Sequence, residues 1–330
     1  MSRWTLAAAL TVGLAAAVLL GIRFGSVPIS TGDLLDALLG RGDPVQRDIV
    51  LHLRLPRVIL AVLVGGGLAV AGATFQALLR NPLAEPYILG ISGGASVGAV
   101  LVLALGWAAV GSWVLPLTAF AGALLAIVLV FRVATSTGRA MDVRVLLLAG
   151  VVIAAFFSAC IAFILSVSPA RTVQSAVLWI MGSLAAATWR SVALTAAYTL
   201  PACLVLLGLA RPLNLMAIGE ETAHYLGADV EGVKRIALGV AALVTASGVA
   251  VAGVIGFVGL VVPHAMRLLA GSDHRALLPL SFIAGAAFLT FADLVARLAL
   301  APTEIPIGVI TAFVGVPFFL VLLRRSLGAR

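Results

Sequence analysis

Residues 56–79 read PRVILAVLVGGGLAVAGATFQALL, and Arg57 is the only charged residue among them. A helix needs about 20 apolar residues to cross the hydrocarbon core of a bilayer, so this stretch predicts a transmembrane helix. The whole chain has the same character: 62% of its 330 residues are hydrophobic and 10% are charged, with a mean hydropathy of +1.20. A soluble domain carries about 25% charged residues. The solvent of this chain is therefore predicted to be lipid.

Apolar runs bounded by charges, prolines or glycine clusters predict further spans on both sides of this one. One boundary rests only on Gly253 and Gly256, which interrupt a single long apolar stretch. The run from Leu6 to Gly21 could pass for a signal peptide, but no small-x-small cleavage site closes it, so we expect a retained first helix. The sequence predicts an all-α polytopic membrane protein, one transmembrane domain over residues 1–330, with about ten spans at 4–24, 56–79, 88–107, 112–133, 144–167, 191–210, 235–253, 254–270, 276–299 and 305–323.

Glycines recur within the predicted spans at helix-packing spacing. Gly90, Gly94 and Gly98 are each four residues apart. Lipid provides no hydrophobic drive for helix association, so small residues that let backbones approach closely are used instead. We expect most of these glycines to serve tight packing.

Basic residues indicate the orientation, because Lys and Arg are favoured in cytoplasmic loops. With the N-terminus inside, most of them fall on the inner side, which predicts a multi-pass protein of the cytoplasmic membrane with both termini cytoplasmic. The exception is the outer loop at about 24–55, where arginines gather between Arg23 and Arg57. Such a local excess suggests an acidic partner, although the aspartates of this loop could neutralise it: Asp33, Asp36, Asp43 and Asp48.

The composition excludes several functions. The formal net charge of +8 comes almost wholly from arginines lying between apolar runs, which argues against nucleic-acid binding. A P-loop requires G-x-x-x-x-G-K-[ST], and the only lysine, Lys234, lies in Val-Lys-Arg, so no ATP site of that kind is expected. The four histidines fall in separate segments and no G-x-S-x-G pattern occurs. We expect a chain that is not an enzyme and that binds no metal or cofactor itself.

Two segments carry a resemblance to a known family. Residues 65–94 read GGGLAVAGATFQALLRNPLAEPYILGISGG, and residues 253–297 read GVIGFVGLVVPHAMRLLAGSDHRALLPLSFIAGAAFLTFADLVAR. Together they resemble the FecCD-type permeases, which import iron-siderophore complexes, haem or cobalamin. The resemblance implies the architecture of a type II ABC importer permease. It also implies a homodimer or a close heterodimer with a paralogue, two ATP-binding subunits that hold ATP and Mg on the inner face, and a periplasmic or lipid-anchored binding protein outside.

Three arginines are candidates for docking the binding protein. Arg54 and Arg57 are three residues apart, so on a helix they share one face. In the family that the chain resembles, such arginines bind glutamates of the binding protein. The alternative is that Arg54 and Arg57 contact lipid headgroups or nearby aspartates. Arg297 follows Asp293 by four residues, the spacing of a helical ion pair. It could hold Asp293 as an intramembrane pair, meet the binding protein, or do both.

The resemblance places a cytoplasmic gate at the inner end of the second span. Asn81 and Leu83 flank the proline that ends this helix, so they are the candidate gate residues. The second gate segment of the family tends to carry small hydroxylated residues. This chain instead has Met141-Asp142-Val143, with Thr135 to Thr137 upstream, which leaves that half of the gate unassigned.

The inner loop at about 212–235 reads PLNLMAIGEETAHYLGADVEGVKR. Gly219 and Gly227 bracket a predicted short helix that starts near Glu220 and Glu221, because acidic residues favour a helix N-terminus. The segment resembles the coupling helices of the family, which fit into a groove of the ATP-binding subunit. The predicted ATPase-coupling residues are Gly219, Glu220, Glu221, Leu226 and Gly227.

The sequence favours an importer permease, and an iron chelate (siderophore or haem) is the expected cargo because it is the commonest in the family. Cobalamin is the alternative cargo. A self-sufficient secondary transporter is the alternative class, but it would need a buried acid or histidine relay in mid-span. Asp293, near one end of its span, is the nearest candidate for such a relay.

Overall fold

A computed structural model describes residues 2–136 and 141–328, and every regular element in these ranges is helical. The helices are α1 (Arg3–Arg23), α2 (Thr31–Leu38), α3 (Pro44–Asp48), α4 (Leu55–Leu78), α5 (Ile91–Ala104), α6 (Val114–Thr135), α7 (Val143–Ser166), α8 (Ala170–Ile180), α9 (Trp189–Gly208), α10 (Ala210–Ile218), α11 (Glu220–Tyr225), α12 (Val230–Ala252), α13 (Val258–Ala270), α14 (His274–Leu298) and α15 (Ile307–Gly328). Short π and 3₁₀ segments, at Ile49–Arg54, Pro86–Leu89 and Trp107–Val110, lie between them.

The predicted spans correspond one to one with helices in the described part of the chain: α1, α4, α5, α6, α7, α9, α12, α13, α14 and α15. Of these, 7 are long and apolar enough to cross a membrane, and the shorter apolar helices are Ile91–Ala104, Val258–Ala270 and Ile307–Val321. The glycine break is confirmed too, since α12 ends at Ala252 and α13 begins at Val258. The prediction of an all-α polytopic protein is confirmed.

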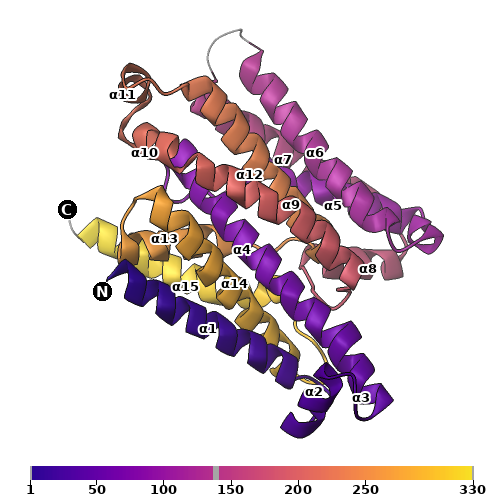
Figure 1. Ribbon diagram of the computed structural model, residues 1–330. Helices are drawn as coiled ribbons and strands as arrows, with labels where there is room; N and C mark the ends of the chain where they lie inside the picture. The colour runs from indigo at the N-terminus through magenta and orange to yellow at the C-terminus, as the bar shows by residue number, and fades with distance from the viewer. Residues whose placement is uncertain (1, 137–140, 329–330) are drawn as a thin grey trace.

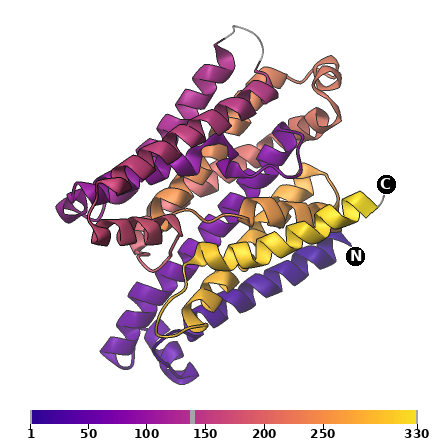
Figure 2. The same ribbon diagram turned by 180° about the vertical axis from the view of Figure 1, so that it is seen from behind.

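Polar side chains cap helices that begin at the end of the bundle where both chain termini lie (Figures 1 and 2). Ser2 accepts from the Thr5 N–H at the start of α1, and Asp229 accepts from the Gly232 N–H at the start of α12. Asp142 and Asp273 do the same for α7 and α14. A helix leaves its first four N–H groups without partners, and short polar side chains satisfy them.

Helix α4 forms the centre of the bundle and is buried over 89% of its membrane-spanning window. Glycines allow its close approach to α14: a Cβ on Gly65 would overlap the carbonyl of Gly285. The same holds for α5 and α6, where a Cβ on Gly94 would overlap the carbonyl of Gly122. Gly90 was expected to serve helix packing, like Gly94 and Gly98. Its φ of +74° instead makes it the left-handed residue that precedes α5.

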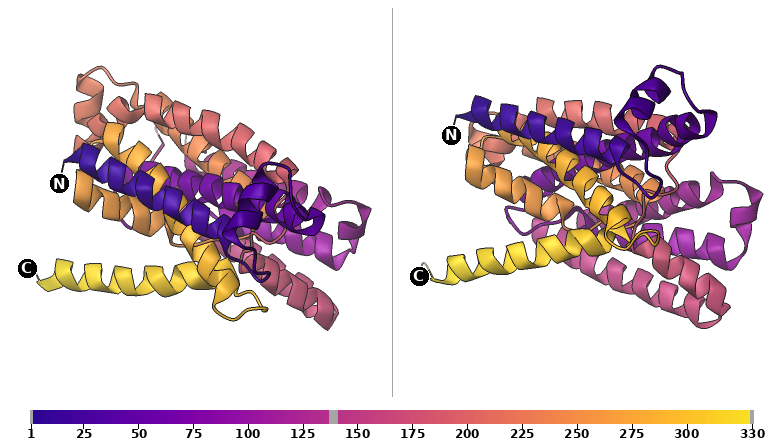
Figure 3. Two further views of the ribbon diagram at one scale, coloured as in Figure 1. Left: turned by 60° about the horizontal axis from the view of Figure 1, so that its bottom comes forward. Right: turned by 90° about the horizontal axis from the view of Figure 1, so that it is seen from below.

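Helix α15 packs less closely than the others and extends away from the bundle (Figure 3). Its exposed large side chains include Phe313 and Leu320. The two predicted loops are largely helical: the outer segment 24–55 contains α2 and α3, and the inner segment 212–235 contains most of α10 and all of α11. Ser30 and Asp43 cap the two outer helices, which explains why this polar segment is ordered.

Candidate functional site

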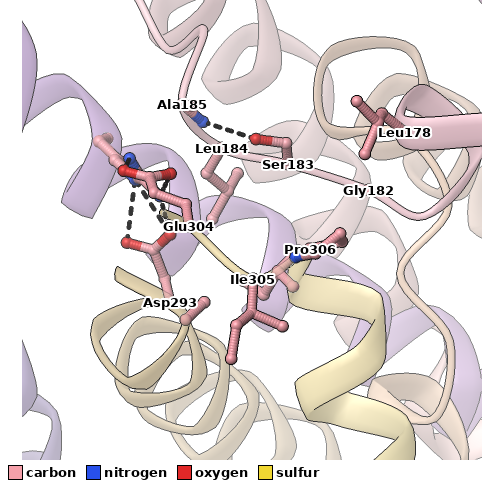
Figure 4. A pocket seen from close by; sticks show the side chains of 12 residues that line it. Leu178, Gly182, Ser183, Leu184, Ala185, Asp293, Glu304, Ile305 and Pro306 are labelled. Carbon is pink, nitrogen blue, oxygen red and sulfur yellow. Dashed lines mark hydrogen bonds and ion pairs between the residues drawn. The ribbon is translucent and has the colours of Figure 1, made fainter. Parts of the chain in front are cut away.

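A cluster of four charged residues lies at the end of the bundle opposite the termini. Arg57 is in the first turn of α4, Asp293 and Arg297 are near the end of α14, and Glu304 precedes α15. Asp293 Oδ1 lies 2.9 Å from Arg57 Nη2, and Asp293 Oδ2 lies 3.1 Å from Arg297 Nε. Figure 4 shows the carboxylates of Asp293 and Glu304 converging. Two positive and two negative charges therefore balance at this site.

Two buried arginines hold the end of α1. Arg54 donates hydrogen bonds to the carbonyls of Ile22, Arg23 and Val27. Arg297 donates to the carbonyls of Gly21 and Phe24, at 3.1 and 3.3 Å. The last four carbonyls of a helix have no partner within it, and cationic side chains can supply the missing donors.

The structure places the three candidate docking arginines in contacts within the chain. Arg54 is 5% exposed and Arg297 is 4% exposed, so neither presents a free guanidinium at the surface. The side chain of Arg57 is 11% exposed and already binds two carboxylates. Docking of a binding protein on these three arginines stays a prediction, and it would require contacts within the chain to rearrange.

A cavity of about 240 Å³ adjoins the charged cluster. Its wall combines Arg57, Asp293 and Glu304 with apolar side chains, among them Leu178, Leu184 and Ile305 (Figure 4). Backbone hydrogen bonds join two of the segments that line it: the N–H groups of Ile307 and Gly308 donate to the carbonyls of Gly182 and Met181, each at 3.1 Å. Ligand pockets typically occupy about 300–1,000 Å³, so this cavity is smaller than a typical ligand pocket.

The connection between α12 and α13 is unwound, and polar side chains from the α4–α5 connection satisfy it. Glu85 Oε1 accepts from the Phe257 N–H at 2.6 Å. The Tyr87 hydroxyl donates to the Ile255 carbonyl at 3.1 Å and accepts from the Ile255 N–H at 3.3 Å. Unwound backbone at membrane depth requires such partners. This role of Glu85 and Tyr87 was not predicted from the sequence, although an acid flanked by Ala84 and Pro86 in an apolar stretch is a signal of it.

Just after the end of α4, Asn81 Oδ1 accepts a hydrogen bond from the Leu83 N–H at 2.9 Å. The Asn81 side chain therefore shapes its own turn, as asparagine commonly does. The side chain of Leu83 is exposed. Of the two candidate gate residues, Leu83 is thus the one that presents its side chain outward. Of the second gate segment, residues 137–140 lie outside the described range.

The predicted short helix is present as α11, between Gly219 and Gly227. Gly227 has a φ of +83°, a conformation that favours glycine. Ala223 is fully buried, whereas Ile218, Tyr225 and Leu226 are 72%, 83% and 61% exposed. Glu220 turns inward to bind Arg80 at 2.7 Å, and Glu221 is exposed. Helix α11 lies at the tip of the bundle (Figure 1), and these exposures show that large apolar side chains are uncovered there.

Comparison with known proteins identifies the family. The model of the FecCD transport family matches residues 13–325. The chain belongs to the FecCD transport family. It is an ABC importer permease, a multi-span membrane subunit of the transporter.

Individual members of the FecCD family resemble the chain over most of its length. An uncharacterised ABC transporter permease, YvrB of Bacillus subtilis, is 42% identical over 96% of this chain and 93% of its own. The cobalamin permease BtuC of Halobacterium salinarum is 47% identical over 84% of this chain and 73% of its own. The vitamin B12 permease BtuC of Escherichia coli O157:H7 is 40% identical over 98% of this chain and 95% of its own.

Solved structures agree with this assignment. An inward-facing structure of a metal-chelate type ABC transporter is 31% identical, with a TM-score of 0.86, over 96% of this chain and 98% of its own. PsaBC of Streptococcus pneumoniae, solved with a Fab, shares 18% identity and a TM-score of 0.56 over 81% of this chain and 90% of its own. The second likeness concerns the fold alone.

Proposed function

We propose that this permease imports a bulky metal chelate and is driven by ATP-binding subunits that dock on α11. The observation that carries the proposal is the set of exposed apolar side chains Ile218, Tyr225 and Leu226 at the end where both termini lie. Beyond the membrane, exposed apolar patches mark interaction sites. With both termini cytoplasmic, this tip lies on the side where ATP is available, and the α2–α3 end faces the binding protein outside.

The docking experiment places a charge in the proposed contact. Leu226→Glu should reduce retention of the ATP-binding subunit during purification and lower ATP-driven uptake. Leu39→Glu is the matched control, because Leu39 is similarly exposed, at 69% against 61%, and lies in the outer segment. Equal retention and uptake in both variants would show that α11 is not the contact.

The second partner in the proposal is another copy of this chain. The cavity of about 240 Å³ is smaller than a typical ligand pocket, and α15 leaves Phe313, at 73% exposure, uncovered. A pathway between two copies would provide the missing volume and cover part of α15. Native mass spectrometry of the purified transporter should then find two permeases with two ATP-binding subunits. One permease per assembly would contradict this arrangement.

For the cargo, we propose an iron chelate, siderophore or haem, with cobalamin as the second candidate. The metal-chelate type transporter of the same fold is in keeping with the first. The two permeases named for cobalamin favour the second. Both cargoes are large metal complexes. Uptake by the assembled transporter with its own binding protein, measured for radiolabelled iron-siderophore, haem and cobalamin, distinguishes them.

A further inference from the structure

Lys234, the only lysine of the chain, is 2% exposed in the early turns of α12. Its ammonium group donates three hydrogen bonds within the inner end of the bundle. The acceptors are Glu220 on α11, Glu231 one turn earlier at 3.2 Å, and the carbonyl of Met141 at 3.0 Å. A lysine has three N–H donors, so all of them are used.

The two carboxylates extend this network to other segments. The second oxygen of Glu220 lies 2.7 Å from Arg80 Nη2. Arg80 directly precedes Asn81, the first of the predicted gate residues, in the sequence. The second oxygen of Glu231 accepts from the Met141 N–H at 3.1 Å, so the backbone of Met141 is held at both its N–H and its carbonyl. The network thereby joins α11 and α12 to the α4–α5 connection and to the segment before α7.

The chemistry of this ion network favours a role in connecting segments that move relative to one another over a role in folding stability. Replacing a buried ion network by apolar residues of similar volume is often neutral or stabilising, so stability alone does not explain it. A lysine ammonium is a compact charge whose three donors rotate, unlike the planar fork of arginine. The ammonium group can therefore stay hydrogen-bonded to its acceptors when they move around it.

We propose that Lys234 is a positioning residue that transmits displacement of α11 to both inner connections. The inference rests on the proposed function, in which an ATP-binding subunit meets the exposed side of α11. Glu220 begins α11 and binds both Arg80 and Lys234, so a shift of α11 acts on both partners. Packed and hydrogen-bonded chains of this kind can carry coupling between distant sites.

The test measures cargo imported per ATP hydrolysed by the permease reconstituted with its ATP-binding subunits and binding protein. Lys234→Met and Glu220→Gln should lower this ratio by about 2- to 30-fold, the range for residues within coupling networks. Retention of the ATP-binding subunit and ATP hydrolysis should stay near wild type. Arg275→Gln, on an exposed charged residue at the start of α14 and outside this network, is the control and should keep the wild-type ratio.

A double variant separates a shared network from two independent effects. If Lys234 and Glu220 act together, Lys234→Met with Glu220→Gln should lower the ratio no further than the worse single variant. If the variants import the wild-type amount of cargo per ATP and lose only thermal stability, the proposal is overturned. The network would then serve only to stabilise the fold. If Lys234→Met does not assemble, the ratio for Glu220→Gln decides. Failure of the wild-type permease to retain its ATP-binding subunit would instead contradict the proposed function.

Discussion

The guanidinium of Arg57 and the carboxylate of Glu304 are joined by two hydrogen bonds, each 2.9 Å long. This pair links the start of α4 to the connection before α15. Asp293 lies beneath it, 1% exposed at its side chain, between Arg57 and Arg297. The two carboxylates thus face one guanidinium from different depths, and their removal should have different consequences.

Asp293→Asn should destabilise the protein much more than Glu304→Gln. Without the Asp293 carboxylate, two buried guanidinium groups lose their shared counter-charge, and breaking a buried pair costs about 3–5 kcal/mol. The Glu304 side chain is 33% exposed, and partly exposed pairs are worth about 0.2–1 kcal/mol. Thermal unfolding in detergent measures both. If the two variants lower the midpoint temperature of unfolding equally, Asp293 is better hydrated than its burial indicates.

Arg54→Met should lower the stability of the protein. The substitution removes the donor to the carbonyls of Ile22 and Arg23 at the end of α1 and of Val27 in the following segment, and each buried acceptor left unsatisfied costs about 1–3 kcal/mol. Arg41→Met, on an exposed arginine of the same segment, is the control and should leave stability unchanged. The salt dependence of binding-protein association is measured in parallel. A stable Arg54→Met protein with a reduced salt dependence would instead support direct docking by Arg54.

Gly65→Ala should prevent normal packing of α4 against α14. The new Cβ would overlap the backbone carbonyl of Gly285, which cannot move as a side chain can, and overpacking costs about 1–3 kcal/mol or more. Gly239→Ala is the control, because nothing lies within 4 Å of its Cβ position. In a helix interior this control should gain about 0.5–1 kcal/mol. The yield of monodisperse protein reports both, and a normal yield for Gly65→Ala would argue against the tight crossing.

The membrane spans were predictable because each is an apolar run of sufficient length with charges or glycines at its ends. The α12–α13 break was predictable from the same kind of signal, since Gly253 and Gly256 interrupt one long apolar run. The short helices α2, α3, α8 and α10 were missed. They are too short or too mixed in polarity to give a distinct signal, and caps such as Ser30 determine where they start.

The candidate site was predicted less completely, because its partners are distant in sequence or belong to the backbone. The spacing of Asp293 and Arg297 indicates a helical pair, but nothing in the sequence brings Glu304 to Arg57. Arg54 reads as an exposed arginine because the carbonyls that it binds leave no sequence pattern. Lys234 excludes a P-loop, yet its contact with the Met141 carbonyl is visible only in the fold.

Reconstitution in liposomes tests the central claim, that this permease depends on separate ATP-binding subunits. The chain alone should neither hydrolyse ATP nor accumulate cargo, because its only lysine is buried in the Glu220–Glu231 network and belongs to no phosphate-binding loop. Addition of the ATP-binding subunits and the binding protein should produce ATP-dependent accumulation. Accumulation by the chain alone, driven by ATP or by an ion gradient, would contradict the account.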